Sequence, residues 1–377
     1  MKVAILESIV MPAGHEVEFN RILVDELKNQ GHEPVFFVPE NFPFKLDYKA
    51  DIRYLQGGEP VSYAGANALQ KIWRSIQREI RRKRWFNSAY ELIMSKECEH
   101  LIIPTATYRF VRSLLKTNLV KSTVPVTIIF HGINPKEIAN FVKYARACER
   151  YANIRLKVIT LRDDLSKYNL NNVQMILPPV FTPRDLGLEP EFKVHEPLRL
   201  GFFGQYRREK NVEFFLDAFI KADFKVPVEL IVQGATARTE DKQDFERIIE
   251  KYKDYTNIKF WHKNLIGQEW QQALLDVDVI LMPYAAERYL YHWGAMLFTA
   301  IGYYKPVLQS PELNPEVLQS FAIGEAIKLD SVEIFSKQLE QFVNEFRNKA
   351  ETYKNALVNA NKEYGQDVFV REIVNEK

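Results

Sequence analysis

The sequence predicts an α/β protein made of two doubly wound domains, each a parallel sheet covered by helices. First, its 377 residues, 46% of them hydrophobic, exceed the usual size of one domain and can form ordinary cores. Second, short β-rich runs alternate with helical patterns along the whole chain. Third, this alternation begins twice, before and after a proline-rich stretch. Because β-helix-β connections are right-handed, each series builds an open parallel sheet.

Strands are expected at short runs rich in β-branched and aromatic residues. Several runs are continuously apolar, which is typical of strands buried on both faces of a sheet. The first series comprises residues 2–6, 34–38, 99–103, 124–130, 156–160 and 174–177, and the second comprises 198–203, 228–232, 257–261, 277–282 and 306–309. Apolar stripes at helical spacing lie between the runs, for example Phe19, Ile22, Leu23 and Leu27, or Val212, Phe215, Leu216 and Phe219.

The polar, proline-rich stretch between the two series predicts a domain boundary. We expect an N-terminal Rossmann-like domain at 1–182, a linker at 183–197 and a C-terminal Rossmann-like domain at 198–355. Residues 356–377 are predicted to form a C-terminal helix that packs back on the N-terminal domain. The two domains are expected to face each other across a cleft at the carboxyl ends of their sheets, where such folds bind ligands.

Composition excludes several classes of protein. Glycine (15) and proline (18) are too few for collagen or low complexity, and 13% aromatic residues argue against disorder. No apolar run reaches the ~20 residues that span a bilayer, and Glu7 interrupts the one candidate signal segment. We therefore expect a cytoplasmic protein. Cys98 and Cys148 are too few for a disulfide framework and lack zinc-site spacing, so both are expected to be buried apolar residues.

Charge is distributed unevenly along the chain. Residues 1–195 hold 28 Lys and Arg against 21 Asp and Glu, whereas residues 196–377 hold 23 against 28. Within 71–85, seven basic residues accompany a single acid, Glu79, and apolar residues recur at helical spacing at Ile72, Trp73, Ile76 and Ile80. A basic amphipathic helix of this kind suits the headgroup layer of an anionic membrane. The alternative is a solvated basic face over a core stripe. No nucleic-acid partner is expected.

Two segments of the second half carry candidate chemistry. Residues 198–219 predict a strand, a glycine-punctuated basic loop and a helix. Gly201 and Gly204 would let backbone approach a ligand, and cationic donors suited to a diphosphate follow at Arg207, Arg208 and Lys210. The alternative interpretation is a tight turn with exposed basic residues.

The second segment, 277–307, predicts strand, loop, helix and strand. Its loop holds Glu287 and His292 as acid and base, and Gly294 begins a helix whose amides can face an anion. Glu287 beside Arg288 is equally compatible with a surface ion pair. Aromatic residues that could stack on a sugar or base, or belong to the core, are Tyr284, Tyr289, Tyr291 and Trp293.

Taken in order, these segments resemble the donor half of GT-B glycosyltransferases, in particular the large retaining family with glycogen-synthase-like donor domains (glycosyltransferase group 1). The resemblance rests on 198–219 with Lys210, the strands 228–234 and 257–261, and the series Asp278, Pro283, Glu287, Gly294, Gly302 and 305–307. The N-terminal half resembles the acceptor domain of the same family at 12–15, 31–33, 130–132, 158–160 and 177–180.

The resemblance implies roles for individual residues. Lys210 would hold the donor diphosphate, Gly14 would admit the donor sugar, and two residues would lie beside the reacting sugar as catalytic residues, His131 and Glu287. The other donor-binding positions are Gly204, Gln205, Arg207, Tyr284, His292, Trp293, Gly294 and Ala295. Two of them depart from the family. Gln205 stands where an arginine is usual, so Arg207 or Arg208 would substitute, and Ala295 stands where a second glutamate normally contacts the ribose.

The expected function is transfer of a sugar from a nucleoside-diphosphate-sugar donor to a glycan or lipid-linked glycan acceptor, with retention by analogy. Cations and helix amides would stabilise the leaving diphosphate, so no metal or cofactor is expected. The one Asp-x-Asp sequence, Asp276 to Asp278, begins a buried strand and is interpreted as structural. Alternatives are a non-catalytic sugar-nucleotide-binding or partner subunit and, more distantly, a sugar-nucleotide epimerase. The expected location is the cytoplasm, peripheral at the inner face of the membrane.

Overall fold

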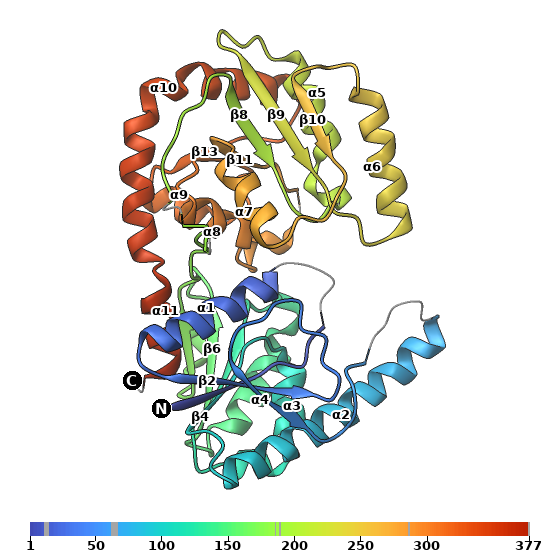
Figure 1. The fold of residues 1–377 in the computed structure, drawn as a ribbon, viewed down its shortest axis with the longest axis vertical. Helices are drawn as coiled ribbons and strands as arrows, with labels where there is room; N and C mark the ends of the chain where they lie inside the picture. The colour runs from blue at the N-terminus through green and yellow to red at the C-terminus, as the bar shows by residue number, and fades with distance from the viewer. Residues whose placement is uncertain (11–14, 62–66, 185, 188–189, 286, 376–377) are drawn as a thin grey trace. The chain divides into compact units, whose positions relative to one another are not determined.

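The computed structural model describes residues 1–10, 15–61, 67–184, 186–187, 190–285 and 287–375 (Figure 1). The chain forms two compact units, unit 1 (Met1–Pro178 and Gln366–Lys377) and unit 2 (Pro179–Gly365). Each unit is an α/β layer structure whose strands all run parallel, so the predicted fold class is confirmed. The boundary after residue 178 and the return to unit 1 at residue 366 differ from the predicted limits at 182 and 355.

Unit 1 contains a seven-stranded sheet of order β3-β2-β1-β4-β5-β6-β7. Its strands are β1 (Lys2–Leu6), β2 (Glu33–Pro39), β3 (Asp51–Leu55), β4 (His100–Ile103), β5 (Val126–Phe130), β6 (Ile154–Ile159) and β7 (Val173–Ile176). Its helices are α1 (His15–Asn29), α2 (Ala68–Met94), α3 (Tyr108–Leu114), α4 (Ile138–Cys148) and α11 (Gln366–Val374), with short 3₁₀ turns η1 (Asn118–Lys121), η2 (Pro135–Glu137) and η3 (Ser166–Tyr168).

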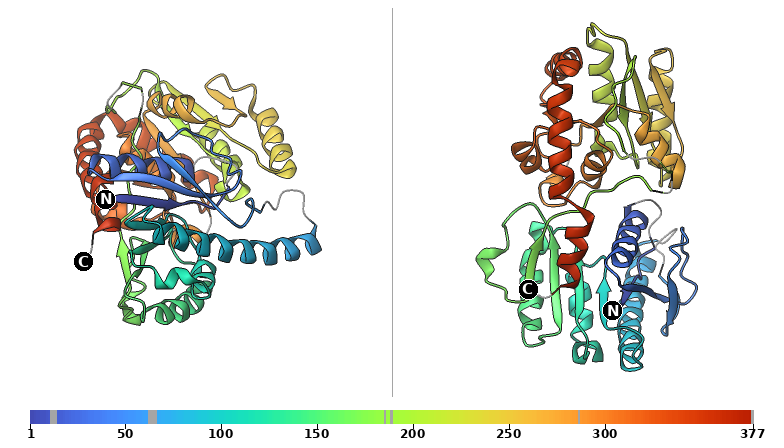
Figure 2. Two further views of the ribbon diagram at one scale, coloured as in Figure 1. Left: turned by 60° about the horizontal axis from the view of Figure 1, so that its bottom comes forward. Right: turned by 60° about the vertical axis from the view of Figure 1, so that its left-hand side comes forward.

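Helices cover both faces of the unit 1 sheet (Figure 2). Alternate strand residues such as Leu6 and Phe37 join one apolar cluster with α2, α3 and α4. On the other face α1 meets α11, where the Phe19 and Phe369 rings lie 5.6 Å apart. The Thr127 hydroxyl also donates to the Ile373 carbonyl at 3.4 Å. The single helix predicted for 356–377 is therefore wrong in its limits, because residues up to 363 continue the preceding helix and only α11 belongs to unit 1.

Unit 2 contains a six-stranded sheet of order β10-β9-β8-β11-β12-β13. Its strands are β8 (Leu198–Phe202), β9 (Val228–Gln233), β10 (Ile258–Trp261), β11 (Val279–Met282), β12 (Val307–Gln309) and β13 (Gly324–Ala326). Its helices are α5 (Val212–Lys221), α6 (Thr239–Tyr252), α7 (Gly267–Leu275), α8 (Ala295–Gly302), α9 (Pro315–Ser320) and α10 (Val332–Glu363), with 3₁₀ turns η4 (Arg208–Lys210) and η5 (Glu287–Leu290).

All eleven predicted strands are present, and the structure adds β3 and β13, which the sequence pattern did not reveal. β3 is an edge strand whose residues are mostly exposed, so it lacks the apolar run that identified its neighbours. β13 has three residues, Gly-Glu-Ala, and pairs with β12 only. Both strands lie at sheet edges, where one side of the strand has no partner and burial constrains the sequence less.

The Asp-x-Asp sequence is integrated into unit 2. The Asp278 carboxylate is fully buried and accepts hydrogen bonds from the amides of His195 and Arg199 at 3.0 and 2.8 Å. The His195 imidazole Nδ1 lies 2.7 Å from the same carboxylate. Asp278 therefore joins the segment before β8 to the start of β11. Within the described ranges, no helix combines the length and apolar character needed to cross a bilayer.

Candidate functional site

Loops that follow neighbouring strands of unit 2 contain two predicted donor-binding residues, Gly204 and Tyr284. Gly204 follows β8, Gly234 follows β9, and Tyr284 follows β11. Because parallel strands all end at the same edge, these loops meet at the carboxyl edge of the sheet. Topology alone thus brings together residues that are up to 80 positions apart in the chain.

Gly204 occupies a backbone conformation that favours glycine. Its φ is +109°, and an added Cβ would lie 3.1 Å from the Lys210 ammonium nitrogen. Its amide donates to the Gln233 side-chain oxygen at 2.7 Å, and the Gln233 side-chain nitrogen donates to the Lys263 carbonyl at 2.5 Å. Gln233 is fully buried, so its two hydrogen bonds hold the backbone of the glycine loop in place. Sequence reasoning missed this residue, whose only signal was a polar side chain at the end of an apolar strand.

Lys210 is a buried cation, only 8% exposed. Its ammonium nitrogen lies 3.4 Å from the Phe203 carbonyl and over the rings of Phe202 and Tyr284, 5.4 and 5.0 Å from their centroids. A carbonyl oxygen and the faces of two aromatic rings are favourable contacts for an ammonium group. The structure therefore places positive charge beside the loop glycine at the sheet edge, where a diphosphate would be bound through charge-assisted hydrogen bonds.

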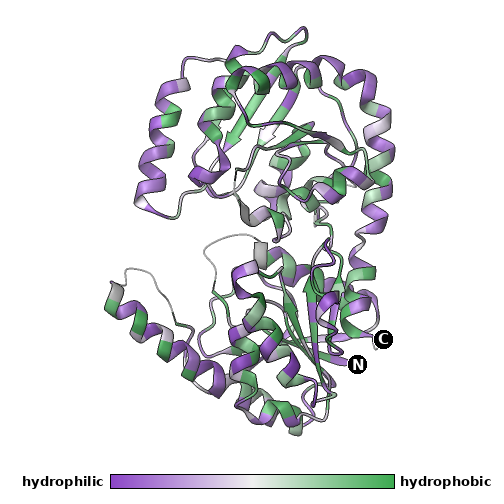
Figure 3. Ribbon diagram, turned by 180° about the vertical axis from the view of Figure 1, so that it is seen from behind, coloured by the Kyte–Doolittle hydropathy of each residue, from purple (hydrophilic) through white to green (hydrophobic). Residues whose placement is uncertain are grey.

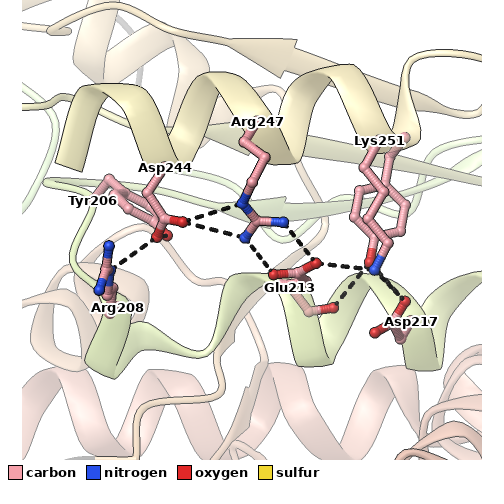
Figure 4. A network of polar contacts seen from close by, with 8 residues as sticks. Tyr206, Arg208, Glu213, Asp217, Asp244, Arg247 and Lys251 are labelled. Atoms are coloured by element: carbon pink, nitrogen blue, oxygen red, sulfur yellow. Dashed lines mark hydrogen bonds and ion pairs between the residues drawn. The ribbon is translucent and has the colours of Figure 1, made fainter. Parts of the chain in front are cut away.

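The two arginines of the loop have different partners. Arg208 donates to the Asp244 carboxylate on α6 at 3.2 Å, and the Tyr206 hydroxyl donates to the same oxygen at 2.6 Å (Figure 4). Arg207 instead donates to the Gln205 side-chain oxygen at 3.2 Å and lies 3.7 Å from Glu209. Of the two candidates to replace the family arginine, Arg207 is therefore the one that lies against the loop's own polar side chains.

A larger ionic network supports the loop from α5 and α6 (Figure 4). Arg247 donates to Glu213 at 2.6 and 3.1 Å and to Asp244 at 3.2 Å, and Lys251 donates to Glu213 at 2.9 Å. The hydrogen bonds from Arg247 lower the pKa of Glu213 to about 2. Burial raises the pKa of Asp244, but its hydrogen bonds from Tyr206 and Arg247 outweigh burial and hold that pKa below its usual value. Both carboxylates are therefore ionised at neutral pH.

The loop after β11 is tied to the glycine loop. The Ala285 amide donates to the Glu209 carbonyl at 2.8 Å. Glu287 begins η5, and its side chain lies outside the described residues. The predicted stacking residues are mostly buried: Tyr284 covers Lys210, and Trp293 stacks on Phe181 with ring planes 7° apart. The His292 ring is partly exposed and lies 5.1 Å from the Tyr291 ring.

Gly294 precedes α8, as the sequence predicts, but its amide is not free. It donates to the Asn314 side-chain oxygen at 2.7 Å, and Asn314 is itself buried. The Gly294 amide itself is therefore occupied within the protein. In the described part of the chain, the amides of Ala295 and Met296 at the first turn of α8 have no acceptor, so these two amides are the ones that could face an anion.

Two further polar groups lie at the same edge. The Gln309 side-chain oxygen and the Ser310 hydroxyl are buried and have no hydrogen-bond partner among the described residues. Both stand where β12 ends beside β11. A buried polar atom without a partner is costly, and such atoms at a ligand-binding edge are typical of groups that a ligand satisfies. Sequence reasoning missed both residues.

In unit 1, His131 follows β5 at the carboxyl edge of its sheet. Its Nε2 lies 2.9 Å from the Pro104 carbonyl and 3.3 Å from the Thr105 hydroxyl, and its ring packs 4.6 Å from Phe19. Since a carbonyl only accepts, Nε2 carries the proton, and in the neutral ring Nδ1 is the acceptor nitrogen. The other predicted residue of this unit, Gly14, lies outside the described residues.

Metal ligands do not gather within the described ranges, where no group of three His, Cys, Asp or Glu side chains has the arrangement of a metal site. The cations and amides at the carboxyl edge of unit 2 are the groups available to an anionic ligand. Cys98 and Cys148 are both buried, and burial raises the pKa of each thiol to about 12. They are apolar core residues of unit 1, as predicted.

Comparison with known proteins relates this geometry to a fold. No protein-family model matches the chain, and no curated protein matches it in sequence. Solved structures do match over nearly the full length. A sucrose-phosphate synthase from Thermosynechococcus elongatus is 12% identical, with a TM-score of 0.67 over 98% of this chain and 96% of the other.

Two further solved structures contain nucleotides. The catalytic domain of starch synthase IV from Arabidopsis thaliana, bound to ADP and acarbose, is 11% identical, with a TM-score of 0.68 over 98% of this chain and 97% of the other. HepE of Anabaena, in complex with UDP and glucose, is 13% identical, with a TM-score of 0.65 over 99% and 97%. The chain therefore has the fold of the GT-B glycosyltransferases, as its sequence motifs predict.

Proposed function

We propose that this protein transfers a sugar from a nucleoside-diphosphate-sugar donor to a glycan or lipid-linked glycan acceptor, with retention of configuration at the transferred carbon. The observation that carries the proposal is Lys210, a buried lysine held beside Gly204 at the carboxyl edge of unit 2. A GT-B fold supports the same assignment, since similar solved structures hold UDP with glucose or ADP with acarbose.

The chemistry asked of the site is stabilisation of a leaving group. When the bond between the sugar C1 and the diphosphate oxygen breaks, negative charge develops on the diphosphate. The acceptor hydroxyl oxygen forms the new bond to C1, and its proton passes to the departing diphosphate oxygen. Lys210 and the first amides of α8 would stabilise this charge, with Arg207 as a third donor. One preorganised donor of this kind is worth about 10²–10³ in rate. These groups make a bound metal ion unnecessary in the proposal.

His131 and Glu287 are proposed to contact the transferred sugar. With Nε2 donating to the Pro104 carbonyl, the neutral His131 ring would accept a hydrogen bond from a sugar hydroxyl through Nδ1. Glu287 stands in η5, directly after the loop that Ala285 joins to the glycine loop. Gly14 and His292 keep the roles that the family resemblance implies.

A second candidate function is a non-catalytic sugar-nucleotide-binding subunit. The observation that favours it is Ala295, which places a methyl group at the first position of α8, where the resemblance expects a ribose-binding carboxylate. Such a subunit would bind the nucleotide but leave the sugar bond intact.

The test is incubation of the purified protein with UDP-, GDP- and ADP-sugars, with release of nucleoside diphosphate measured by chromatography. A transferase is expected to hydrolyse its own donor slowly without an acceptor, and thermal unfolding with each free diphosphate identifies the base, since ligand at 100 times its Kd stabilises by ~2.7 kcal/mol. Binding without hydrolysis, in the presence of mixed glycan and lipid-linked acceptors, would favour the non-catalytic subunit. No binding of any nucleotide would overturn both.

A further inference from the structure

The helix α2 consists of an anchored half and an exposed half. Near the middle of the helix, Glu79 fixes α2 to α3, because its carboxylate accepts from Arg112 of α3 and from Arg82 of α2 itself, each at 3.1 Å. The Trp85 indole also donates to the Gly58 carbonyl at 3.0 Å. The N-terminal half extends away from the unit 1 sheet (Figure 1). The rigid C-terminal half therefore sets the direction of the exposed turns.

The exposed half starts at a defined helix cap. The Asn67 side chain accepts from the Gln70 amide at 2.9 Å, and the Gln70 side chain accepts from the Asn67 amide at 3.0 Å. This reciprocal capping box stabilises a helix N-terminus without tertiary contacts. The exposed turns are thus a formed helix in the free protein.

One side of this half is apolar and exposed to solvent. Residues at helical spacing form a stripe in which each residue is between 46% and 79% exposed, namely Leu69, Ile72, Trp73, Ile76 and Ile80. Large apolar side chains are rarely exposed together in this way unless they mark an interaction surface. The predicted alternative, a core stripe under a solvated basic face, is wrong, because these residues do not join the core of unit 1.

Cations border the apolar stripe. Lys83 and Arg84 follow Ile80 by three and four residues, which places them on the same side of the helix. Neither they nor Lys71 lies within ion-pair distance of a carboxylate in the described ranges. Figure 3 shows apolar and polar residues interleaved along this part of α2.

A groove of about 500 Å³ lies between α2 and the turn at Gly57 and Gly58. It is lined by apolar and guanidinium side chains, Trp73, Ile76, Ile80, Arg81 and Arg84. The groove therefore presents apolar surface and positive charge together, the two features that match a phospholipid with its acyl chains and its anionic headgroup.

We propose that the exposed half of α2 is a docking surface for an anionic phospholipid bilayer, with the apolar stripe in the acyl boundary and the flanking cations at the phosphates. Charge complementarity selects this occupant. Within 71–84 there are seven basic residues and one acid, Glu79, which pairs with the buried Arg82, so the segment as a whole carries a strong positive charge. A second copy of this chain would present the same positive charge and repel it. Membrane docking through α2 does not depend on the proposed transfer reaction, because α2 contains none of the residues assigned to that reaction.

The test is co-sedimentation of the full chain with vesicles of phosphatidylcholine alone or with about one third phosphatidylglycerol. The protein is expected to bind the anionic vesicles at low salt. It should bind neutral vesicles much more weakly, and also anionic vesicles in 0.5 M salt, because the Debye length shortens from ~10 Å at 0.1 M salt to ~3 Å at 1 M. The double variant Trp73→Ser/Ile76→Ser should weaken binding about tenfold or more. Lys83→Gln/Arg84→Gln should weaken it about fivefold per charge removed.

Matched controls lie in unit 2. Ile266→Ser removes another exposed apolar residue, and Lys328→Gln/Lys337→Gln removes two other exposed cations. Both are expected to sediment as the parent does. Circular dichroism and thermal unfolding verify that every variant is folded. The proposal is overturned if the parent does not bind anionic vesicles at low salt, or if the stripe variant binds as the parent does. A dimer in sedimentation velocity that is lost in the stripe variant would assign the surface to a second copy instead.

Discussion

Two groups of basic residues, one in each unit, differ in how the protein holds them. Around the glycine loop of unit 2, Lys210 is buried against a carbonyl and two rings, and Arg208 is paired with Asp244. On α2 of unit 1, Lys83 and Arg84 stand beside exposed apolar side chains without a carboxylate partner in the described ranges.

The difference separates two uses of positive charge. A preorganised cation in a partly desolvated position acts on one ligand atom and is screened little by salt. Cations spread along an exposed helix act through their summed field, which salt screens and which tolerates the loss of any single residue. In the sequence, both groups are simply basic residues. Their burial and their hydrogen-bond partners in the folded protein distinguish them. The predictions below test this distinction, beginning with the largest expected effect.

Lys210→Ala is expected to lower turnover by about 10²–10³ and to weaken nucleoside-diphosphate binding, because it removes the buried cation from the sheet edge. Donor hydrolysis and calorimetric titration measure the two effects. Lys225→Ala, an exposed lysine of the same unit, is the control and should behave as the parent. Equal nucleotide affinity in parent and variant would contradict the donor-site assignment.

His131→Ala is expected to lower kcat about tenfold while nucleoside-diphosphate affinity stays within a factor of about two, since a hydrogen bond made to the sugar appears in kcat. Glu287→Ala is expected to act in the same direction. Steady-state kinetics with an identified acceptor provide the measurement. His32→Ala, at the opposite edge of the unit 1 sheet, is the control. A loss of nucleotide affinity in His131→Ala would show that His131 acts on the nucleotide rather than the sugar.

Asp244→Asn is expected to weaken nucleoside-diphosphate binding about fivefold, because Arg208 and Tyr206 lose the charged acceptor that positions the loop. Asp217→Asn is the matched control. Asp217 belongs to the same network but bonds Lys251 and Tyr252, away from the loop. If both variants bind nucleotide equally, the network stabilises the unit without positioning the loop.

Arg207→Ala is expected to reduce donor hydrolysis about threefold, the loss of one partly exposed donor. Arg207→Ala should lower turnover more than Arg208→Ala does, when each loss of turnover is compared with the same variant's loss of nucleotide affinity. The reason is that Arg208 is already held by Asp244. Single-turnover hydrolysis of the donor separates the two. An unchanged rate in Arg207→Ala would reject the idea that Arg207 replaces the arginine absent at Gln205.

Acid stability should differ between the two basic regions. Glu213 has a folded-state pKa of about 2, below the value near 4.3 of an unfolded chain. Its contribution is therefore present above pH ~4.3 and is lost as pH falls toward 2. Thermal unfolding of Glu213→Gln should depend less steeply on pH in this window than that of the parent. Lys83→Gln/Arg84→Gln should follow the parent, and an identical profile in Glu213→Gln would contradict the assignment.

Much of the architecture was predictable because it rests on local patterns. Apolar runs identified eleven strands, since a strand buried on both faces needs continuous apolar residues. The basic helix was predictable from spacing, and Gly204 and Lys210 from a strand-loop-helix pattern. The edge strands β3 and β13 were not predictable, because exposed edges impose little pattern on their residues.

The sequence by itself determined that the chain folds into two parallel α/β units, and which loops carry cations and glycines, because hydrophobic periodicity and residue chemistry act locally. Only the tertiary structure decided how those residues are used. Asp244 bonds Arg208, 36 residues away in the chain, and the Asn314 side chain accepts from the Gly294 amide, 20 residues away. The anchoring of one half of α2, which leaves its apolar stripe exposed, likewise depends on Arg112 of another helix. Partners distant in the chain leave no local pattern, so burial and pairing emerge only when the sheets assemble.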